Sequence, residues 1–400
     1  MSDAARDRPL FRRNFVTLLA AQASFGYAFS SFFMLPKFLV TELGASPVEI
    51  GLVAASYSTA TIAVMPILGV WVDRFGRRVF MTAGALLMAS LSAAFVFVVE
   101  VGPLVYLLRA AQGLAFSMVF VGGSALAVDE APPERIGQAI GLFGLAMLSM
   151  NGVAAACVEA ISLRAGWPVA FLAAAASATL CALLSRLLRE PGFAVAEARD
   201  SGLLQVLRRP NLLRLLFVIA MVGAAMSTVV TFHQPFALGL GIETVSGFFV
   251  AYAAAAMIVR AALGHWIDRA GRRRVATFSL CVYFVDVASM AWLSGAAGLL
   301  VLGVGLGVAH GFAYPSLNSL AVAGADSRER GKVMALFQGG FHVGFASAAL
   351  GFGILADQQG YGPVFLGGGA CALLGLVAIA AAPVVRATPA SGGARGSGSS

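Results

Sequence analysis

Two copies of one ten-residue stretch lie half a chain apart. Residues 69–78 read GVWVDRFGRR and residues 264–273 read GHWIDRAGRR, at an offset of 195 positions. The triplet LAV recurs at 126–128 and at 320–322, at an offset of 194. Because the offset changes by a single position between these segments, chance similarity does not explain the match. The sequence therefore predicts an internal duplication, with one copy of the stretch in each half.

Apolar residues dominate the rest of the chain. Of its 400 residues, 59% are hydrophobic and 12% are charged, against about 45–50% and about 25% in soluble domains. A membrane-spanning helix needs about 20 mainly apolar residues. The predicted fold class is therefore an all-α integral membrane protein with twelve transmembrane helices, arranged as two pseudo-symmetric six-helix bundles. The predicted spans lie near 15–38, 48–71, 79–99, 103–128, 137–162, 166–188, 211–239, 244–266, 275–295, 297–322, 332–356 and 361–385.

Polar segments divide the chain into five parts. We expect a cytoplasmic N-terminus over 1–14, an N-terminal bundle over 15–188, a cytoplasmic linker over 189–210, a C-terminal bundle over 211–385 and a disordered tail over 386–400. With both termini inside, 24 of the 27 Lys and Arg residues lie on the cytoplasmic side. This bias follows the positive-inside rule and predicts a multi-pass protein of the cell inner membrane.

The placement of charge also bears on partners. The net charge of +8 is divided among short clusters between apolar runs, unlike the continuous basic face of a nucleic-acid-binding protein. We therefore expect a lipid bilayer and a small-molecule substrate as partners, no nucleic acid, and a monomer.

The repeated stretch suits a short turn between antiparallel spans. Gly76 and Gly271 fall where the backbone must reverse or adopt a positive φ, and Gly69 and Gly264 fall where a neighbouring helix can approach closely. A carboxylate at a membrane boundary is costly unless it is paired, so both aspartates are expected to meet an arginine or a helix N-terminus. The arginines hold the turn at the anionic membrane surface. The loop residues of interest are Gly69, Asp73, Arg74, Gly76, Arg77, Arg78, Gly264, Asp268, Arg269, Gly271, Arg272 and Arg273.

Both copies resemble the signature loop of the major facilitator superfamily, and the resemblance covers nearly all of the chain between its termini. A second motif of that family, an arginine of the fourth span followed by a glycine, matches Arg109, Gln112 and Gly113. The resemblance implies the fold of that superfamily, in which two six-helix bundles rock about a central site and expose it to each side in turn. It further implies that Asp73 and Asp268 hold the cytoplasmic side closed through charge contacts between the bundles. Arg109 would act in proton coupling or shape the cavity.

The overall pattern resembles the drug/proton antiporter-like branch of the superfamily. One feature of that branch is missing, because residues 149–157 read SMNGVAAAC and lack the Gly-Pro pair of its fifth-span motif. The small residues of this stretch still permit tight helix packing.

Ionisable residues inside apolar spans indicate functional sites, since an unpaired charge in lipid is costly. His310 and His342 lie near the middle of the tenth and eleventh spans, where imidazoles suit proton coupling or a polar substrate contact; a structural hydrogen bond is the alternative for each. Asp286 of the ninth span is either a coupling residue or a protonated partner of another helix. Glu159, near the outer end of the fifth span, is a candidate for the vestibule wall. Candidate substrate contacts, with helix packing as the alternative, are Gln22, Tyr27, Tyr314 and Asn318.

The predicted function is secondary active transport, with proton-coupled export of a small amphiphilic or organic molecule by antiport as the leading hypothesis. A proton-coupled symporter that imports a sugar or organic acid is the first alternative, and a membrane sensor or scaffold without transport is the second. The chain has no P-loop sequence that would bind ATP. Its histidines lack the spacing of a metal site, and no Ser–His–Asp order indicates a hydrolase. We expect no enzyme activity, no cofactor and no bound metal.

Overall fold

The computed structural model describes residues 10–190, 210–262, 269–323 and 329–381, and over these ranges the chain forms helices and turns with no strand. The helices of the first repeat are α1 (Arg13–Ser31), α2 (Leu35–Thr41), α3 (Pro47–Phe75), α4 (Arg77–Ala94), α5 (Pro103–Glu130), α6 (Ile136–Ala165) and α7 (Trp167–Arg186). Those of the second repeat are α9 (Pro210–Gly239), α10 (Ser246–Ala262), α12 (Arg272–Ser289), α13 (Ala296–Ala323), α14 (Arg330–Gln359) and α15 (Tyr361–Ala380).

These helices match the twelve predicted spans. Eleven of them are long and apolar enough to cross a membrane, with α1 and α2 counted together as the span Arg13–Thr41. The twelfth is α10, whose described part has 17 residues and ends where residues 263–268 fall outside the described chain. Gly264 and Asp268 of the second loop copy lie in that gap.

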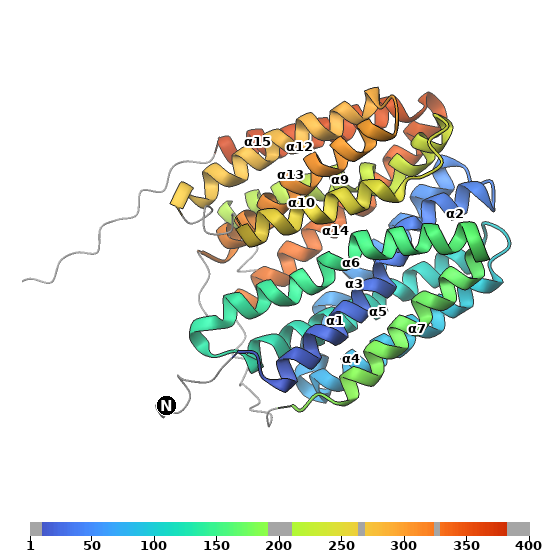
Figure 1. Cartoon of the computed structure of the whole chain (residues 1–400). Coiled ribbons are helices and arrows are strands. Elements are labelled where there is room, and N and C mark those ends of the chain that lie inside the picture. The colour runs from blue at the N-terminus through green and yellow to red at the C-terminus, as the bar shows by residue number, and fades with distance from the viewer. Residues whose placement is uncertain (1–9, 191–209, 263–268, 324–328, 382–400) are drawn as a thin grey trace, which may run out of the picture.

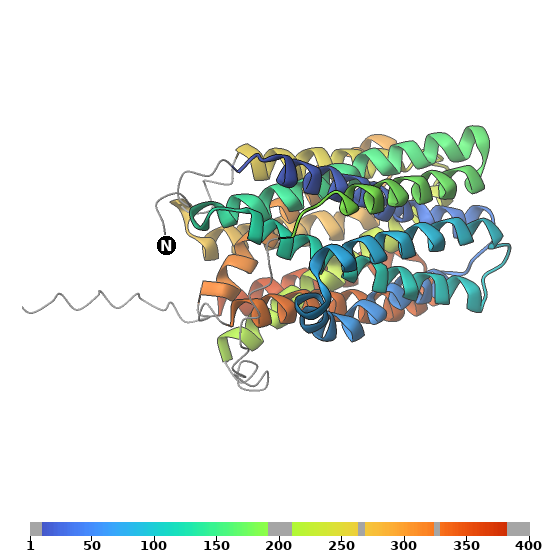
Figure 2. The same cartoon turned by 90° about the horizontal axis from the view of Figure 1, so that it is seen from below.

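The helices form two bundles that lie side by side, one coloured blue to green and the other yellow to red (Figures 1 and 2). Between the bundles, α3 packs along α14 and α6 packs along α10. In the sequence repeat, α3 of the first half corresponds to α10 of the second, and α6 corresponds to α14. The contact of α3 with α14 therefore corresponds to the contact of α10 with α6. The packing therefore has the pseudo-two-fold relation that the duplication predicts.

Turns join consecutive helices at the two opposite ends of each bundle. We call the end with the turns at Gly76 and Gly271 the motif end, and the opposite end the far end. Gly76 has a φ of 106° and Gly271 has a φ of 89°, which confirms the predicted need for glycine in these turns. At the far end, α3 begins with a capping box in which the Ser46 hydroxyl accepts from the Glu49 N–H and the Glu49 carboxylate accepts from the Ser46 N–H.

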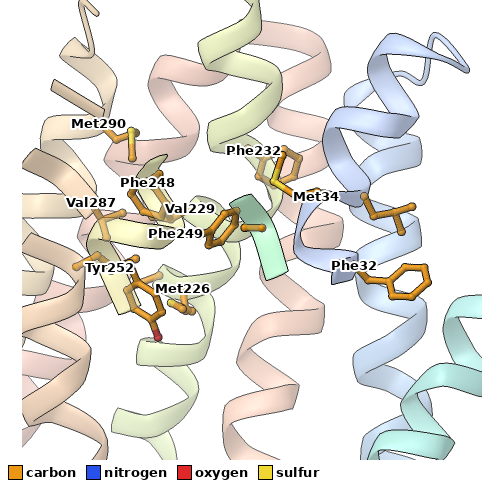
Figure 3. Packing of buried hydrophobic residues seen from close by; sticks show 14 of the residues in the cluster. Phe32, Met34, Met226, Val229, Phe232, Phe248, Phe249, Tyr252, Val287 and Met290 are labelled. Carbon is orange, nitrogen blue, oxygen red and sulfur yellow. The ribbon is translucent and has the colours of Figure 1, made fainter. Parts of the chain in front are cut away.

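Apolar side chains join the two bundles near the far end. One buried cluster contains Phe32 and Met34 of the first repeat together with Phe232, Phe248 and Phe249 of the second, and Figure 3 shows these residues in one region between the helices. A second large cluster is confined to the first bundle. The two bundles are therefore packed against each other at the far end.

Candidate functional site

A cavity of about 290 Å³ lies between the two bundles. Its walls come from α1, α3, α5 and α6 on one side and from α9, α10, α13 and α14 on the other. A binding site at the interface of two repeats is the arrangement expected for a transporter of this architecture. Among the described residues, no cluster of three or more His, Cys, Asp or Glu side chains is placed to hold a metal ion.

Arg109 on α5 forms part of the cavity wall. Its guanidinium donates to the Gln112 side-chain oxygen at 2.7 Å, and its central carbon lies 5.0 Å from the centre of the Tyr57 ring. A side chain at Gly113 would clash with the backbone carbonyl of Tyr57, so this glycine lets α5 approach α3 closely. Of the three residues of the fourth-span motif, Arg109 lines the cavity, while Gln112 holds its guanidinium and Gly113 packs against α3.

Both central histidines also line the cavity. The Nδ1 atom of His342 lies 3.3 Å from the Ser58 hydroxyl of α3, so this contact joins the two bundles. The Nδ1 atom of His310 lies 2.8 Å from the Tyr283 hydroxyl. Tyr314 lines the same cavity and donates its hydroxyl proton to Gln338 of α14.

Other predicted site residues lie outside the cavity lining. Gln22 is buried between α1 and α6, where its amide contacts the sulfur of Met147 at 3.5 Å. Asp286 packs against Gly305 of α13 within its own bundle. Tyr27 and Asn318 are likewise absent from the lining. Asn318 lies on the same helix face as Tyr314, one turn further along α13.

Arg260 of α10 lines the cavity, and the sequence analysis missed it. Its position four residues before the second loop copy suggested a charge at the membrane surface. The apolar residues 253–259 ahead of it are the signal that could have placed it inside the membrane.

A polar network joins the bundles at the far end. Lys37 and Glu159, both buried, form a salt bridge of 2.7 Å. The Glu159 carboxylate also accepts the backbone N–H groups of Val245 and Ser246, each at 3.0 Å. Ser246 begins α10, so the carboxylate lies at the positive N-terminal end of a helix of the other bundle. Glu159 therefore does not line an open vestibule. Its carboxylate instead forms a contact between the two bundles at the far end.

Two further contacts complete this network. Gln234 of α9 donates its side-chain amide to the Phe33 carbonyl at 2.6 Å and accepts the Lys37 N–H at 3.2 Å. The Lys37 ammonium also donates to the backbone carbonyl of Glu243. We call Lys37, Glu159 and Gln234, with their backbone partners, the latch.

The motif end has a different arrangement. Asp73 is exposed, and its ion pair in the described chain is with Arg77 at 3.7 Å, one turn along in sequence. Arg77 also pairs with Asp129 at the end of α5, and Arg78 donates to the Leu188 carbonyl at 3.3 Å. These contacts all lie within the first bundle. Among the described residues, Asp73 forms no ion pair with the second bundle, so the contact that the resemblance implies stays a prediction.

The second loop copy shows the same pattern where it is described. Arg273 donates to the Ala380 carbonyl at 2.8 Å, within its own bundle. A Cβ at Gly69 would meet no described atom within 4 Å, so the described chain does not show the predicted close approach there.

Glycines on the helices that face the other bundle show where the two bundles come into contact. Near the far end, a Cβ at Gly51 would clash with the Ala349 carbonyl, and one at Gly152 would lie 2.9 Å from the Val250 Cα. In the halves of α3, α6 and α14 nearer the motif end, a Cβ would meet no described atom within 4 Å at Gly69, Gly137, Gly141, Gly331 or Gly339. Among the described residues, the bundles therefore touch at these far-end glycines, whereas the glycines nearer the motif end face no described atom of the other bundle.

Comparison with known proteins agrees with this architecture. The family model described as Major Facilitator Superfamily matches residues 16–328. The chain belongs to the major facilitator superfamily and is a membrane transporter, which confirms the resemblance seen in the two loops.

Individual relatives are more distant. "Multidrug resistance protein 1" of Bacillus subtilis is 28% identical over 158 residues, which are 38% of this chain and 39% of that protein, so the match spans less than half of the relative. The "Multi-drug resistance efflux pump PmrA homolog" of Lactococcus lactis is 26% identical over 310 residues, 73% of this chain and 76% of that protein. A crystal structure of the nucleoside transporter NupG covers 92% of this chain and 99% of its own, with a TM-score of 0.77 and 13% identity, which shows the shared fold.

Proposed function

We propose that this chain is a proton-coupled exporter of small amphiphilic organic molecules that works by alternating access in the cell inner membrane. We further propose that the motif end faces the cytoplasm, so that the conformation described above faces inward. The observation that carries the proposal is the cavity between the bundles, which the latch and the apolar cluster close at the far end. The two curated relatives with multidrug-resistance names support export.

Alternating access requires the closure to move from one end to the other. Opening the far end breaks the bonds from Glu159 to the N-terminus of α10. Closing the motif end gives the exposed Asp73 a partner on the other bundle. The N-terminus of α14, which begins at Arg330, offers a positive helix end of the kind that binds a carboxylate. Each conformation thus holds one carboxylate of the first bundle at a helix N-terminus of the second.

Proton coupling needs a titratable group whose contacts differ between the two conformations. His342 lines the cavity and contacts Ser58 of the other bundle. A proton on both ring nitrogens makes the imidazole a donor on each side and adds a charge, which changes the contacts that this side chain makes across the cavity. We therefore place the coupling proton on His342.

Transport by the purified chain in proteoliposomes with an imposed pH gradient tests the proposal. We expect amphiphilic substrates to move against their concentration gradient while protons move in the opposite direction. The compartment from which the substrate is exported should then become more acidic, in a fixed ratio to the substrate moved. His342→Gln should abolish the response to the gradient while substrate exchange between the two sides persists. Movement of substrate and protons in the same direction would instead establish symport. If no compound of a panel of sugars, organic acids and amphiphiles moves, the transport proposal fails.

A further inference from the structure

The charge of the cavity wall points to one class of substrate for the proposed transporter. We infer that the cavity binds an organic anion carrying one or two rings, with its acidic group held by Arg109 and Arg260. This inference rests on the proposed function for the movement of that anion, but not for its binding.

The first observation is an excess of positive charge. Arg109 comes from the first bundle and Arg260 from the second, and both line the same cavity. Among the described residues that line it, none is Asp or Glu. Within the part of the chain that is described, no ion pair includes either arginine. Charges removed from water are costly unless they are paired, so an anionic ligand would supply the missing counter-charge.

The second observation is a set of donors without acceptors. The Nε atoms of Arg109 and Arg260 are buried and make no hydrogen bond with the described residues, and the same holds for the Tyr57 hydroxyl. All three groups line the cavity and can donate a proton. Guanidinium groups bind carboxylate, sulfonate and phosphate oxygens in a two-point geometry that a neutral ligand does not match.

The third observation is the character of the remaining wall. Rings of Phe29, Phe116 and Phe120 face the cavity from one bundle, and those of Phe341 and Phe345 face it from the other. Aromatic walls favour ligands that offer flat apolar surface. The volume of about 290 Å³ is at the lower limit of pockets for drug-sized ligands. An acid with one or two rings fits these conditions better than an inorganic anion or a large lipid.

Placing one arginine on each bundle also has a mechanical consequence. An anion bound by both side chains links the bundles, whereas the empty cavity leaves two like charges facing one space. Binding therefore favours a conformation in which Arg109 and Arg260 approach each other, and a ligand shifts a conformational equilibrium through such differential contacts. A cationic ligand gains nothing from either arginine and meets repulsion from both.

The experiment uses the full-length protein in nanodiscs and four probes that separate charge from shape. Naphthalene-2-sulfonate is a permanent anion, naphthalene-2-sulfonamide is neutral, and (2-naphthylmethyl)trimethylammonium is a permanent cation; inorganic sulfate is an anion without rings. Calorimetry at fixed pH and salt measures the affinity of each. We expect the sulfonate to bind at least about tenfold more tightly than the sulfonamide, and the cation and sulfate to bind more weakly than both. Equal or tighter binding of the sulfonamide or the cation would overturn the inference, and equal binding of sulfate would overturn its organic part.

Variants assign the charge to the two arginines. Arg109→Gln and Arg260→Gln should each weaken sulfonate binding about tenfold or more and leave sulfonamide binding within about twofold. Arg109→Lys, which keeps the charge, should recover part of the affinity, and Arg164→Gln, at an exposed position of the far end, should change nothing. A uniform loss for all probes, with melting temperatures unchanged, would show a structural role and refute the assignment.

Transport with the same probes separates this inference from the proposed function. If cations or neutral amphiphiles are pumped but the sulfonate does not bind, the anion site is refuted and the transport proposal stands. If the sulfonate binds through both arginines but no compound crosses the membrane, the site stands and the transport proposal fails.

Discussion

Replacing Glu159 by glutamine tests the latch with a change of almost no volume. Opening the far end breaks the bonds from this carboxylate to the N–H groups of Val245 and Ser246, because these groups belong to the other bundle. The salt bridge to Lys37 lies within the first bundle and can persist in both conformations. The substitution therefore weakens the far-end-closed conformation more than the open one.

The size of the shift follows from the bonds that cross between the bundles. A hydrogen bond to a charged group contributes about 1.5 kcal/mol or more, so the two bonds give about 3 kcal/mol. A glutamine oxygen still accepts one neutral bond worth about 1 kcal/mol, which leaves a loss of about 2 kcal/mol. Since about 1.4 kcal/mol is a factor of ten, the ratio of closed to open far ends should fall roughly 30-fold.

Distances between spin labels at positions 164 and 240 measure this ratio. Arg164 on α6 and Leu240 beyond α9 are exposed and belong to different bundles. In a background without the native cysteines, Glu159→Gln should add or enlarge a long-distance population. Glu42→Gln is the matched control, because Glu42 accepts the Trp167 indole N–H at 3.0 Å within the first bundle at the same end. Identical distance distributions for the two variants would refute the latch.

Three further predictions use other contacts. Gly152→Val places a side chain against Val250 and should open the far end, seen as faster alkylation from that end of a cysteine at the cavity-lining position 230, whereas Gly141→Ala, with open space around it, should have no effect. Asp73→Asn should reduce transport by about tenfold or more by weakening closure of the motif end, with more labelling of cavity cysteines from the cytoplasmic side; unchanged labelling would contradict this role. His342→Ala should remove the pH dependence of substrate binding that protonation of this imidazole causes, and a pH dependence identical to that of the parent would exclude His342 as the coupling group.

The sequence predicted the fold well, for a physical reason. Lipid requires long apolar helices, so the apolar runs along the sequence located the twelve spans. The duplicated loop then set the repeat and identified Gly76 and Gly271 as turn residues, and the intramembrane position of Arg109 marked the cavity wall. Each of these features depends on residues that lie close together in sequence.

The parts that sequence reasoning missed depend on distant residues. Lys37 and Glu159 are 122 positions apart in the chain, and the latch adds backbone groups of the second repeat. Read singly, each is a charge near the end of a span, so neither indicates a salt bridge between packed helices. Asp286 shows the same limit, because its sequence position left a coupling residue and a partner of another helix both open, and the structure places it against Gly305 of α13.

The central claim is that closure alternates between the two ends. Spin-label distances across both ends of the parent protein test it directly, with one pair at 164 and 240 and another at 138 and 330, where Gln138 on α6 and Arg330 on α14 are exposed at the motif end. Addition of a transported substrate or a change of pH should lengthen the far-end distance and shorten the motif-end distance in the same fraction of molecules. Distances that stay fixed at both ends, or that lengthen together, would contradict alternating access.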